Sequence, residues 1–268
     1  MYPGVEIRKG GSNKHLRALG KTCVLGLGFG MGLPTFLGRV RAERITCSVA
    51  DAKRAFAAYQ SSFPRIKELR RKLMQAFEKA VQGCSTETPL WRMRCAQSSG
   101  TGAPTVAIDL PTGRSLYYRS IRIDHEMTER GPRPGVWFAP SYGGKGKAAP
   151  ATKRNQRKRF ADGVVRHRLI PQVVVENVVQ AIGRDIMVHQ VLELERRGFP
   201  VAWHAHDEIV VLCPRCACTT ACGSQCGWTL AGAALLEVMG RVPATLSRLA
   251  GLPVGCELNQ NVRETYAA

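Results

Sequence analysis

The stretch VAWHAHDEIVVL, from 201 to 212, places three side chains suited to metal binding or proton transfer next to one another: His206, Asp207 and Glu208. Apolar residues before and after them predict two strands of a hairpin, with the acids at its tip. Inside a buried strand such a cluster would be costly unless it were paired, hydrated or bound to a cation. The pattern therefore favours a metal site at a strand corner, and a surface turn with solvated charges is the alternative.

A second pattern repeats every four residues in the segment RALGKTCVLGLGFGMG, from 17 to 32, and comprises Arg17, Lys21, Leu25 and Phe29. In a helix these residues would share one face, with two cations followed by an apolar and an aromatic side chain. Such a face suits a phosphate tail and then a base or sugar. The glycines of the segment, at about 1 kcal/mol each in a helix interior, favour instead a strand and a phosphate loop. Their spacing, GxGxGxG, differs from the dinucleotide-binding GxGxxG.

Half of the ten cysteines lie between 213 and 226, and two close pairs stand out: Cys213 with Cys216, and Cys222 with Cys226. Four thiolates in so compact a loop can hold one structural Zn²⁺ ion in a knuckle-like site. The interval between the pairs is shorter than in common zinc ribbons, so a cysteine-rich loop without metal is the alternative. Cys218 is assigned to neither interpretation.

The charge of the chain makes nucleic acid the first partner to consider. Its 268 residues include 39 Lys and Arg against 20 Asp and Glu, a net charge of +19. Neutralising phosphates releases counterions and gives affinity for any nucleic acid sequence; an ordinary basic enzyme is the alternative. The start of the chain has no apolar signal region, and glycines and a proline interrupt the apolar run from 22 to 38. We therefore expect a soluble, cytoplasmic protein with no membrane partner.

The remaining elements follow from periodicity and turn residues. Helices are predicted at 49–62, 64–82, 173–197 and 229–241, a hairpin at 105–109 and 115–123, and a short strand at 254–258. In the third helix, one buried face is expected to comprise Val175, Val178, Val179, Ile182 and Ile186. Another face would align Glu176, Gln180 and Arg184 as a contact row. Residues 145–168 are basic and poorly patterned, which predicts a mobile insert that serves as a linker or a nucleic-acid-binding arm.

Taken together and in order, six motifs resemble the C-terminal half of family A DNA polymerases, especially the phage-type members. They are LRALGKTCVLGLGFGMG, AYQSSFPRI, DLPTGRSLYY, YGG, VVENVVQAIGRD and HAHDEIVV. The resemblance begins at about residue 17 and covers most of the chain. It implies template-directed DNA synthesis, with a primer-template, deoxynucleoside triphosphates and Mg²⁺ as partners.

The resemblance also implies roles for single residues. Arg17 and Lys21 would bind the triphosphate, and Phe29 would line the pocket of the nascent base pair. Leu25 replaces a frequent aromatic residue near the sugar. Gln180 would contact DNA near the primer terminus, and His206 would also bind DNA. Asp207, with Glu208 beside it, would bind catalytic Mg²⁺.

One part of the family's catalytic centre has no counterpart in this sequence. Two-metal catalysis needs carboxylates that reach the two metal ions from both sides. Neighbouring residues on a strand point to opposite faces, so Asp207 and Glu208 cannot both do so. In the family a DxSxxE strand upstream of the fingers helix supplies the second aspartate, and no such pattern precedes Arg17. We therefore expect the chain alone to be inactive, and to need a separate upstream fragment. A split-gene subunit or remnant that binds nucleic acid without catalysis is the alternative.

The expected architecture is α+β, a partial polymerase right hand. Residues 1–135 would form helical fingers. Residues 136–268 would form an incomplete palm, with an antiparallel hairpin packed on helices, the basic insert at about 145–172 and the cysteine-rich loop at 213–226. A third hypothesis, a dinucleotide-binding oxidoreductase built on the glycine run, leaves the basic face and the acidic hairpin unexplained.

Overall fold

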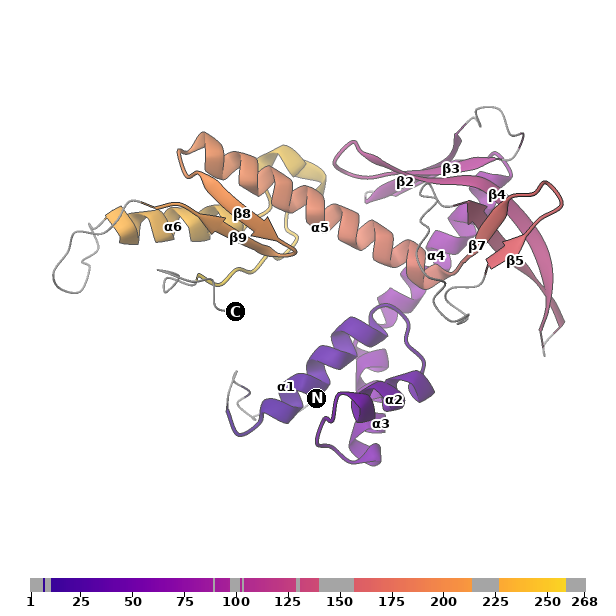
Figure 1. Cartoon of the computed structure of the whole chain (residues 1–268), viewed down its shortest axis with the longest axis horizontal. Coiled ribbons are helices and arrows are strands. Elements are labelled where there is room, and N and C mark those ends of the chain that lie inside the picture. The colour runs from indigo at the N-terminus through magenta and orange to yellow at the C-terminus, as the bar shows by residue number, and fades with distance from the viewer. Residues whose placement is uncertain are drawn as a thin grey trace. The chain divides into compact units, whose positions relative to one another are not determined.

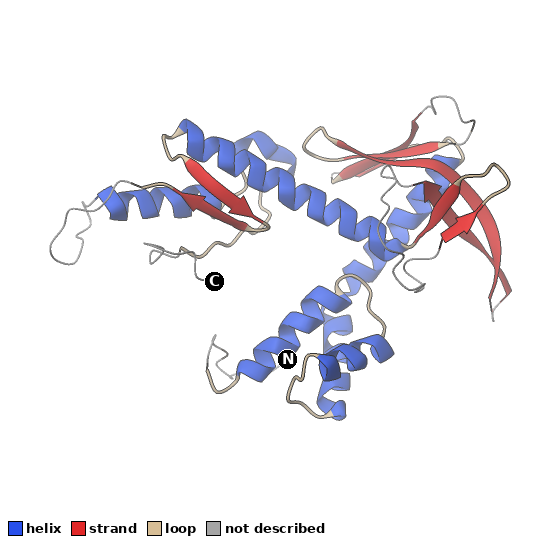
Figure 2. Ribbon diagram, in the orientation of Figure 1, coloured by secondary structure: helices blue, strands red, loops and turns tan. Residues whose placement is uncertain are grey.

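The computed structural model of the chain describes residues 7, 11–88, 90–96, 102, 104–128, 131–139, 157–213 and 227–258. Its architecture is α+β with an antiparallel sheet, as the sequence predicts (Figures 1 and 2). The chain divides into two compact units. The first comprises Met1–Thr86, Met93–Ile108 and Leu116–Val178, and the second comprises Glu87–Arg92, Asp109–Ser115 and Val179–Ala268.

Helices form the first part of the first unit: α1 (Lys14–Thr22), the π-helical segment η1 (Cys23–Leu27), α2 (Leu33–Ala42), α3 (Val49–Ser62) and α4 (Pro64–Val81). The Ser48 hydroxyl caps α3 by accepting a hydrogen bond of 3.0 Å from the backbone N–H of Asp51. Pro64 begins α4, where its missing N–H and fixed φ suit the first helical position. These signals explain why α3 and α4 match the predicted helices so closely.

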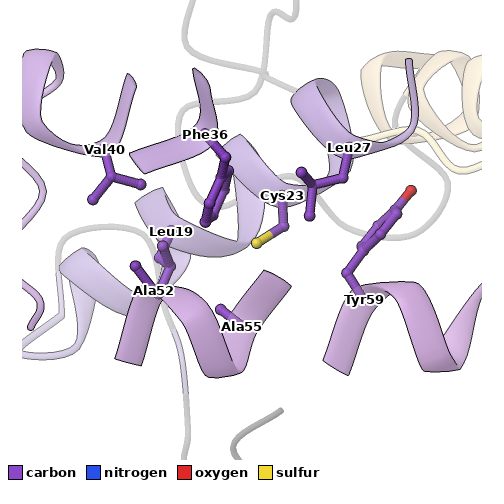
Figure 3. Packing of buried hydrophobic residues seen from close by; sticks show 8 residues of the cluster. All are labelled: Leu19, Cys23, Leu27, Phe36, Val40, Ala52, Ala55 and Tyr59. Carbon is purple, nitrogen blue, oxygen red and sulfur yellow. The ribbon is translucent and has the colours of Figure 1, made fainter. Parts of the chain in front are cut away.

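The first three helices and η1 share one apolar core (Figure 3). It comprises Leu19, Cys23, Leu27, Phe36, Val40, Ala52, Ala55 and Tyr59, all of them buried. Three of these residues, Leu19, Cys23 and Leu27, recur every four positions and mark the buried face of the α1–η1 helix. Burial, with a smaller contribution from nearby Cys47, raises the pKa of the Cys23 thiol to about 11.

A seven-stranded sheet follows the helices: β1 (Thr86–Thr88), β2 (Trp91–Ala96), β3 (Thr105–Asp109), β4 (Ser115–Thr128), β5 (Gly131–Ala139), β6 (Arg157–Arg159) and β7 (Val165–Leu169). Its strand order is β1-β2-β3-β4-β5-β7-β6. The predicted hairpin at 105–123 is confirmed as β3 and β4. Because the helices end at Val81, the strands from Thr86 on lie inside the region that the sequence assigned to helical fingers.

One face of the sheet is covered by helices. On this face Tyr118 of β4 is buried, its ring 5.4 Å from that of Phe77 in α4. Its hydroxyl oxygen accepts a 3.0 Å hydrogen bond from Nδ2 of Asn177 in α5 (Pro171–Arg196). Burial raises the pKa of Tyr118 to about 12.

The described part of the basic insert forms strands rather than an unpatterned segment. β6 pairs with β7, with Lys158 opposite Arg166, and β7 pairs with β5. Arg166 is completely buried. A cation at a buried strand position interrupts the apolar alternation from which strands are recognised, which explains why the sequence pattern did not indicate this hairpin.

In α5, the predicted helix is confirmed, but its buried face is rotated from the one expected. Val175, Val178 and Ile186 are buried and Ile182 is half-buried, whereas Val179 is 48% exposed. Val174, Val178, Ala181 and Asp185 are all buried and follow the helical period at intervals of three and four. Val179 was therefore wrongly placed in the core.

Besides Glu87–Arg92 and Asp109–Ser115, the second unit contains residues 179–196 of α5 and the hairpin β8 (Val201–Ala205) and β9 (Glu208–Val211). The helix α6 (Gly227–Met239) and the 3₁₀ segment η2 (Ala244–Leu249) complete its regular structure among the described residues. Gln190 of α5 holds the end of α6, because its Nε2 donates to the carbonyls of Met239 and Arg241 at 3.0 Å each. Ile186 packs with Leu246 and Leu249 of η2.

The predicted strand at 254–258 is wrong, since residues 252–258 have no regular structure. Pro253 has no backbone N–H to donate, and β8 and β9 form a sheet of two strands. Within the described ranges, no helix is long and apolar enough to cross a membrane.

Candidate functional site

Two cations predicted to bind a triphosphate lie exposed on α1. Arg17 and Lys21 are both exposed, and Leu25 in η1 is 53% exposed. Each of these exposed residues is two positions from a buried one, Leu19 or Cys23, which in a helix places it on the opposite side. The exposed row therefore lies on the side of the helix away from the core. The row therefore has the exposure that contact with a charged ligand requires.

Phe29, the fourth member of the predicted row, lies beyond the helix. η1 ends at Leu27, and the chain turns through residues 28–30, where Gly30 adopts a φ of +84°. A left-handed residue of this kind favours glycine. Phe29 is half-buried. The glycines thus end the helix in a turn. The segment forms neither of the two structures expected from the sequence, a helix that continues through Phe29 or a strand followed by a phosphate loop.

Side chains from α4 and α5 pack closely around this turn within the first unit. A Cβ placed on Gly30 would lie 2.0 Å from Nη1 of Arg70 and 2.7 Å from Cγ of Gln172. One on Gly28 would lie 3.3 Å from the Tyr59 hydroxyl oxygen. Burial lowers the pKa of Arg70 and raises that of Tyr59. The positive φ of Gly30 and the close approach of Gln172 therefore favour glycine beside Phe29.

The acidic hairpin forms as predicted in the second unit. β8 and β9 pair in antiparallel register with Ala205 opposite Glu208, and His206 and Asp207 form the turn between them. His206 has a φ of +50°, which suits a tight two-residue connection. His206, Asp207 and Glu208 are all exposed, so their side chains are accessible to a ligand.

The hairpin tip has the right donor chemistry for a hard cation, but few donors. Carboxylate oxygens are the ligands that Mg²⁺ prefers, in an octahedral arrangement. Among the described residues, no three His, Cys, Asp or Glu side chains come together as a metal-binding group. Magnesium binding by Asp207 and Glu208 stays a prediction.

The predicted contact row on α5 is present in part. Gln180 and Arg184 are exposed, and Glu176 is half-buried and interacts with neighbouring groups. Gln180 belongs to the second unit, with Asp207, whereas Arg17 and Lys21 belong to the first. The triphosphate-binding and metal-binding roles are therefore separate predictions, one for each unit.

Sequence reasoning missed Asp185 of α5, which is 9% exposed and receives hydrogen bonds from the β3–β4 turn. Arg114 Nε donates to its Oδ1 at 2.9 Å, and the Thr112 hydroxyl donates to Oδ2. Arg114 Nη2 also lies 2.8 Å from Oδ1. These contacts fix the turn of the LPTGR motif to the helix that carries Gln180. The available signal was its spacing: Asp185 lies seven residues after Val178 and four after Ala181, so this acid shares the buried face of α5.

The cysteine cluster is described only at its first residue. Cys213 is half-buried, and burial raises the pKa of its thiol. Cys216, Cys222 and Cys226 lie outside the described residues, so the zinc site stays a prediction.

Comparison of the chain with protein-family models, with curated proteins and with solved structures found no match. The proposed function therefore depends on the residues and their motifs.

Proposed function

We propose that the chain is the fingers and part of the palm of a family A DNA polymerase, acting in template-directed nucleotidyl transfer. The observation that carries this proposal is the exposure of both motif regions. Arg17 and Lys21 face solvent on α1, and Asp207 lies exposed at the tip of a two-stranded hairpin. A packing role would have buried or neutralised these groups.

Each residue has a distinct role in this proposal. Arg17 and Lys21 neutralise the negative charge that develops on the triphosphate as the bond to the leaving pyrophosphate breaks. Phe29 lines the pocket for the nascent base pair, held by the Gly30 turn. Gln180 contacts DNA near the primer terminus, and His206 also binds DNA.

Asp207, with Glu208, would hold Mg²⁺ at the hairpin tip. Bound there, the ion would neutralise phosphate oxygens and lower the pKa of the attacking primer hydroxyl. Two-metal catalysis needs carboxylates on both sides of the metal ions, and neighbouring strand residues point to opposite faces, so a further carboxylate would be needed. In the family this is the aspartate of the DxSxxE strand.

A second function is favoured by the net charge of +19. The chain would then bind primer-template without catalysis, as a split-gene subunit or a remnant. The high positive charge is sufficient for that role.

Primer extension with Mg²⁺ distinguishes the two functions. The purified chain is tested alone and with a separately supplied polymerase fragment that carries a DxSxxE strand. We expect no extension by the chain alone and nucleotide incorporation with the fragment. Asp207→Ala should abolish incorporation, whereas Glu87→Ala, a charge-matched change at an exposed residue of β1, should preserve it.

Three outcomes are decisive. Incorporation by the isolated chain that is lost in Asp207→Ala would overturn the requirement for a second chain. Binding of primer-template without incorporation in either mixture would support the non-catalytic function. Incorporation that is unchanged in Asp207→Ala would contradict the role of the hairpin.

A further inference from the structure

One face of the sheet is defined by the register of its strands. Arg119 of β4 lies opposite Ala139, and Arg122 lies opposite Trp137. Positions 139 and 137 are two residues apart on β5 and so share a face. Arg119 and Arg122, three residues apart, therefore share that face as well, because the register shifts between them.

A bulge at Ser120 causes this register shift. Ser120 has a φ of +53°, and buried Arg166 secures it by donating from Nε to the Ser120 carbonyl at 2.6 Å and from Nη2 to the hydroxyl oxygen at 2.9 Å. An extra residue in one strand redirects the side chains beyond it. In a regular strand Arg119 and Arg122 would point to opposite faces, so the bulge gathers them on one.

Lys158 of β6 belongs to the same face. It lies opposite Arg166. Arg166 and Arg168 are two residues apart on β7 and share a face, and Arg168 lies opposite Trp137. Lys158 Nζ is also 5.4 Å from the centre of the Phe160 ring. The face thus extends across β4, β5, β7 and β6, on the side opposite to buried Tyr118.

An exposed aromatic ring lies among these cations. Tyr117 is 48% exposed, and the guanidinium carbon of Arg119 lies 5.7 Å from its ring centre. The side chains of Arg122 and Lys158 are each 50% exposed. Asp162 and Asp124 pair with these two cations, and Arg119 is a third exposed cation on the face. The face is therefore cationic, with a ring available for stacking.

We propose that this face of the sheet binds single-stranded DNA, with a base stacked on Tyr117 and phosphates bound by Arg119, Arg122 and Lys158. Stacking on an exposed ring requires an unpaired base, which a duplex does not offer without distortion. The inference rests on the proposed function for the identity of its ligand, since a polymerase has to hold a single-stranded template.

Fluorescence anisotropy with a fluorescein-labelled twelve-nucleotide oligo-dT tests this inference, using the whole chain without Mg²⁺ or nucleotides. We expect Tyr117→Ala to weaken binding about fivefold or more, since stacking is a main source of single-strand affinity. Tyr117→Phe keeps the ring and should bind within about twofold of wild type. Arg119→Gln should lower the slope of log affinity against log salt by about 0.7, the value for one phosphate on a single strand.

The control is Lys67→Gln, an equal loss of charge at an exposed position of α4, which should leave the affinity near that of wild type. Circular dichroism confirms that each variant is folded. Unchanged binding by Tyr117→Ala would overturn the inference. So would equal affinity for a duplex of the same length, because duplex binding does not use the ring.

Failure of this inference and failure of the proposed function give different results. The anisotropy assay contains no catalytic components, and Asp207→Ala should bind oligo-dT like wild type. Tyr117-dependent binding together with no primer extension in any mixture would reject the polymerase and retain the single-strand surface. Primer extension together with Tyr117-independent binding would do the reverse.

Discussion

Arg166 and Asp162 form a forked ion pair in which the arginine is completely buried. Arg166 Nη1 donates to Oδ1 of Asp162 at 2.9 Å, and Nη2 donates to Oδ2 at 2.7 Å. The guanidinium also lies 5.0 Å from the centre of the Phe160 ring and donates to the Ser120 carbonyl. One side chain therefore joins the turn after β6, the strand β7 and the bulge in β4.

Replacing Arg166 should destabilise the sheet. Arg166→Met removes the ion pair with Asp162 and the support of the Ser120 bulge. We expect the free energy of unfolding to fall by about 2 to 4 kcal/mol. This is less than the largest losses for buried pairs, because Asp162 can still be hydrated. Urea unfolding measures the change. Arg157→Met, at an exposed position of β6, is the control and should change it by less than about 0.5 kcal/mol.

The same pair predicts a loss of stability in acid. The hydrogen bonds from Arg166, then those from the backbone N–H of Val164, hold the pKa of Asp162 far below its ordinary value. A carboxyl whose folded pKa is depressed contributes stability above its unfolded pKa of about 3.9, and this contribution is lost as the pH falls toward the folded value. The urea midpoint should fall less between pH 5.5 and pH 3 in Asp162→Asn than in wild type. An equal fall in both proteins would contradict the prediction.

Elements with local signals were predictable from the sequence. The β8–β9 hairpin follows from apolar runs around a polar centre, and α3 and α4 follow from the Ser48 cap and from Pro64. The β6–β7 hairpin was not predictable, because Arg166 is buried only when strands distant in sequence bring Ser120 against it. Burial of a charge depends on its tertiary partners, which a local pattern does not contain.

For the candidate site, the sequence indicated which side chains would be available to a ligand, but not the backbone turn or the hydrogen bonds around them. Exposure of Arg17, Lys21 and Asp207 agrees with ligand contact. The turn at Gly30 was not predicted, because the four-residue period continues through the glycines while the backbone does not. Asp185 was missed since its role depends on the β3–β4 turn, far from α5 in sequence.

Asp185 should stabilise the second unit through both of its hydrogen-bonded partners. Asp185→Asn weakens the contact with Arg114 and leaves polar groups poorly paired, and we expect a loss of about 1 to 3 kcal/mol in the free energy of unfolding. Combining it with Arg114→Ala should give a loss smaller than the sum of the single changes, because the residues share one interaction. Arg184→Ala, at the exposed neighbouring position, is the control. Strict additivity would argue against the contact.

The cysteine cluster predicts bound metal. If Cys213, Cys216, Cys222 and Cys226 hold zinc, protein purified under reducing conditions should contain about one zinc ion per chain. Cys216→Ser with Cys222→Ser should remove it, and Cys84→Ser, an exposed cysteine elsewhere in the chain, should not. Metal content measured by mass spectrometry decides between a zinc site and a loop without metal.

Two glycines of the segment from 17 to 32 should respond to alanine in opposite directions. Gly30 has a φ of +84°, and a Cβ there would lie 2.0 Å from Arg70 Nη1. Gly30→Ala should therefore lower the free energy of unfolding by about 1 to 3 kcal/mol. Gly20 lies within α1 with nothing within 4 Å of its Cβ position, so Gly20→Ala should raise it by about 0.5 to 1 kcal/mol.

Adding Arg70→Ala to Gly30→Ala separates the two causes of that loss. It removes the conflict with Arg70 and leaves the strained φ and the 2.7 Å approach to Cγ of Gln172, so only part of the stability should return. Full recovery would mean that the turn has no conformational requirement for glycine. Because the turn holds Phe29, Gly30→Ala should also weaken nucleotide incorporation in the two-chain primer extension assay more than Gly20→Ala does, if Phe29 lines the pocket for the nascent base pair.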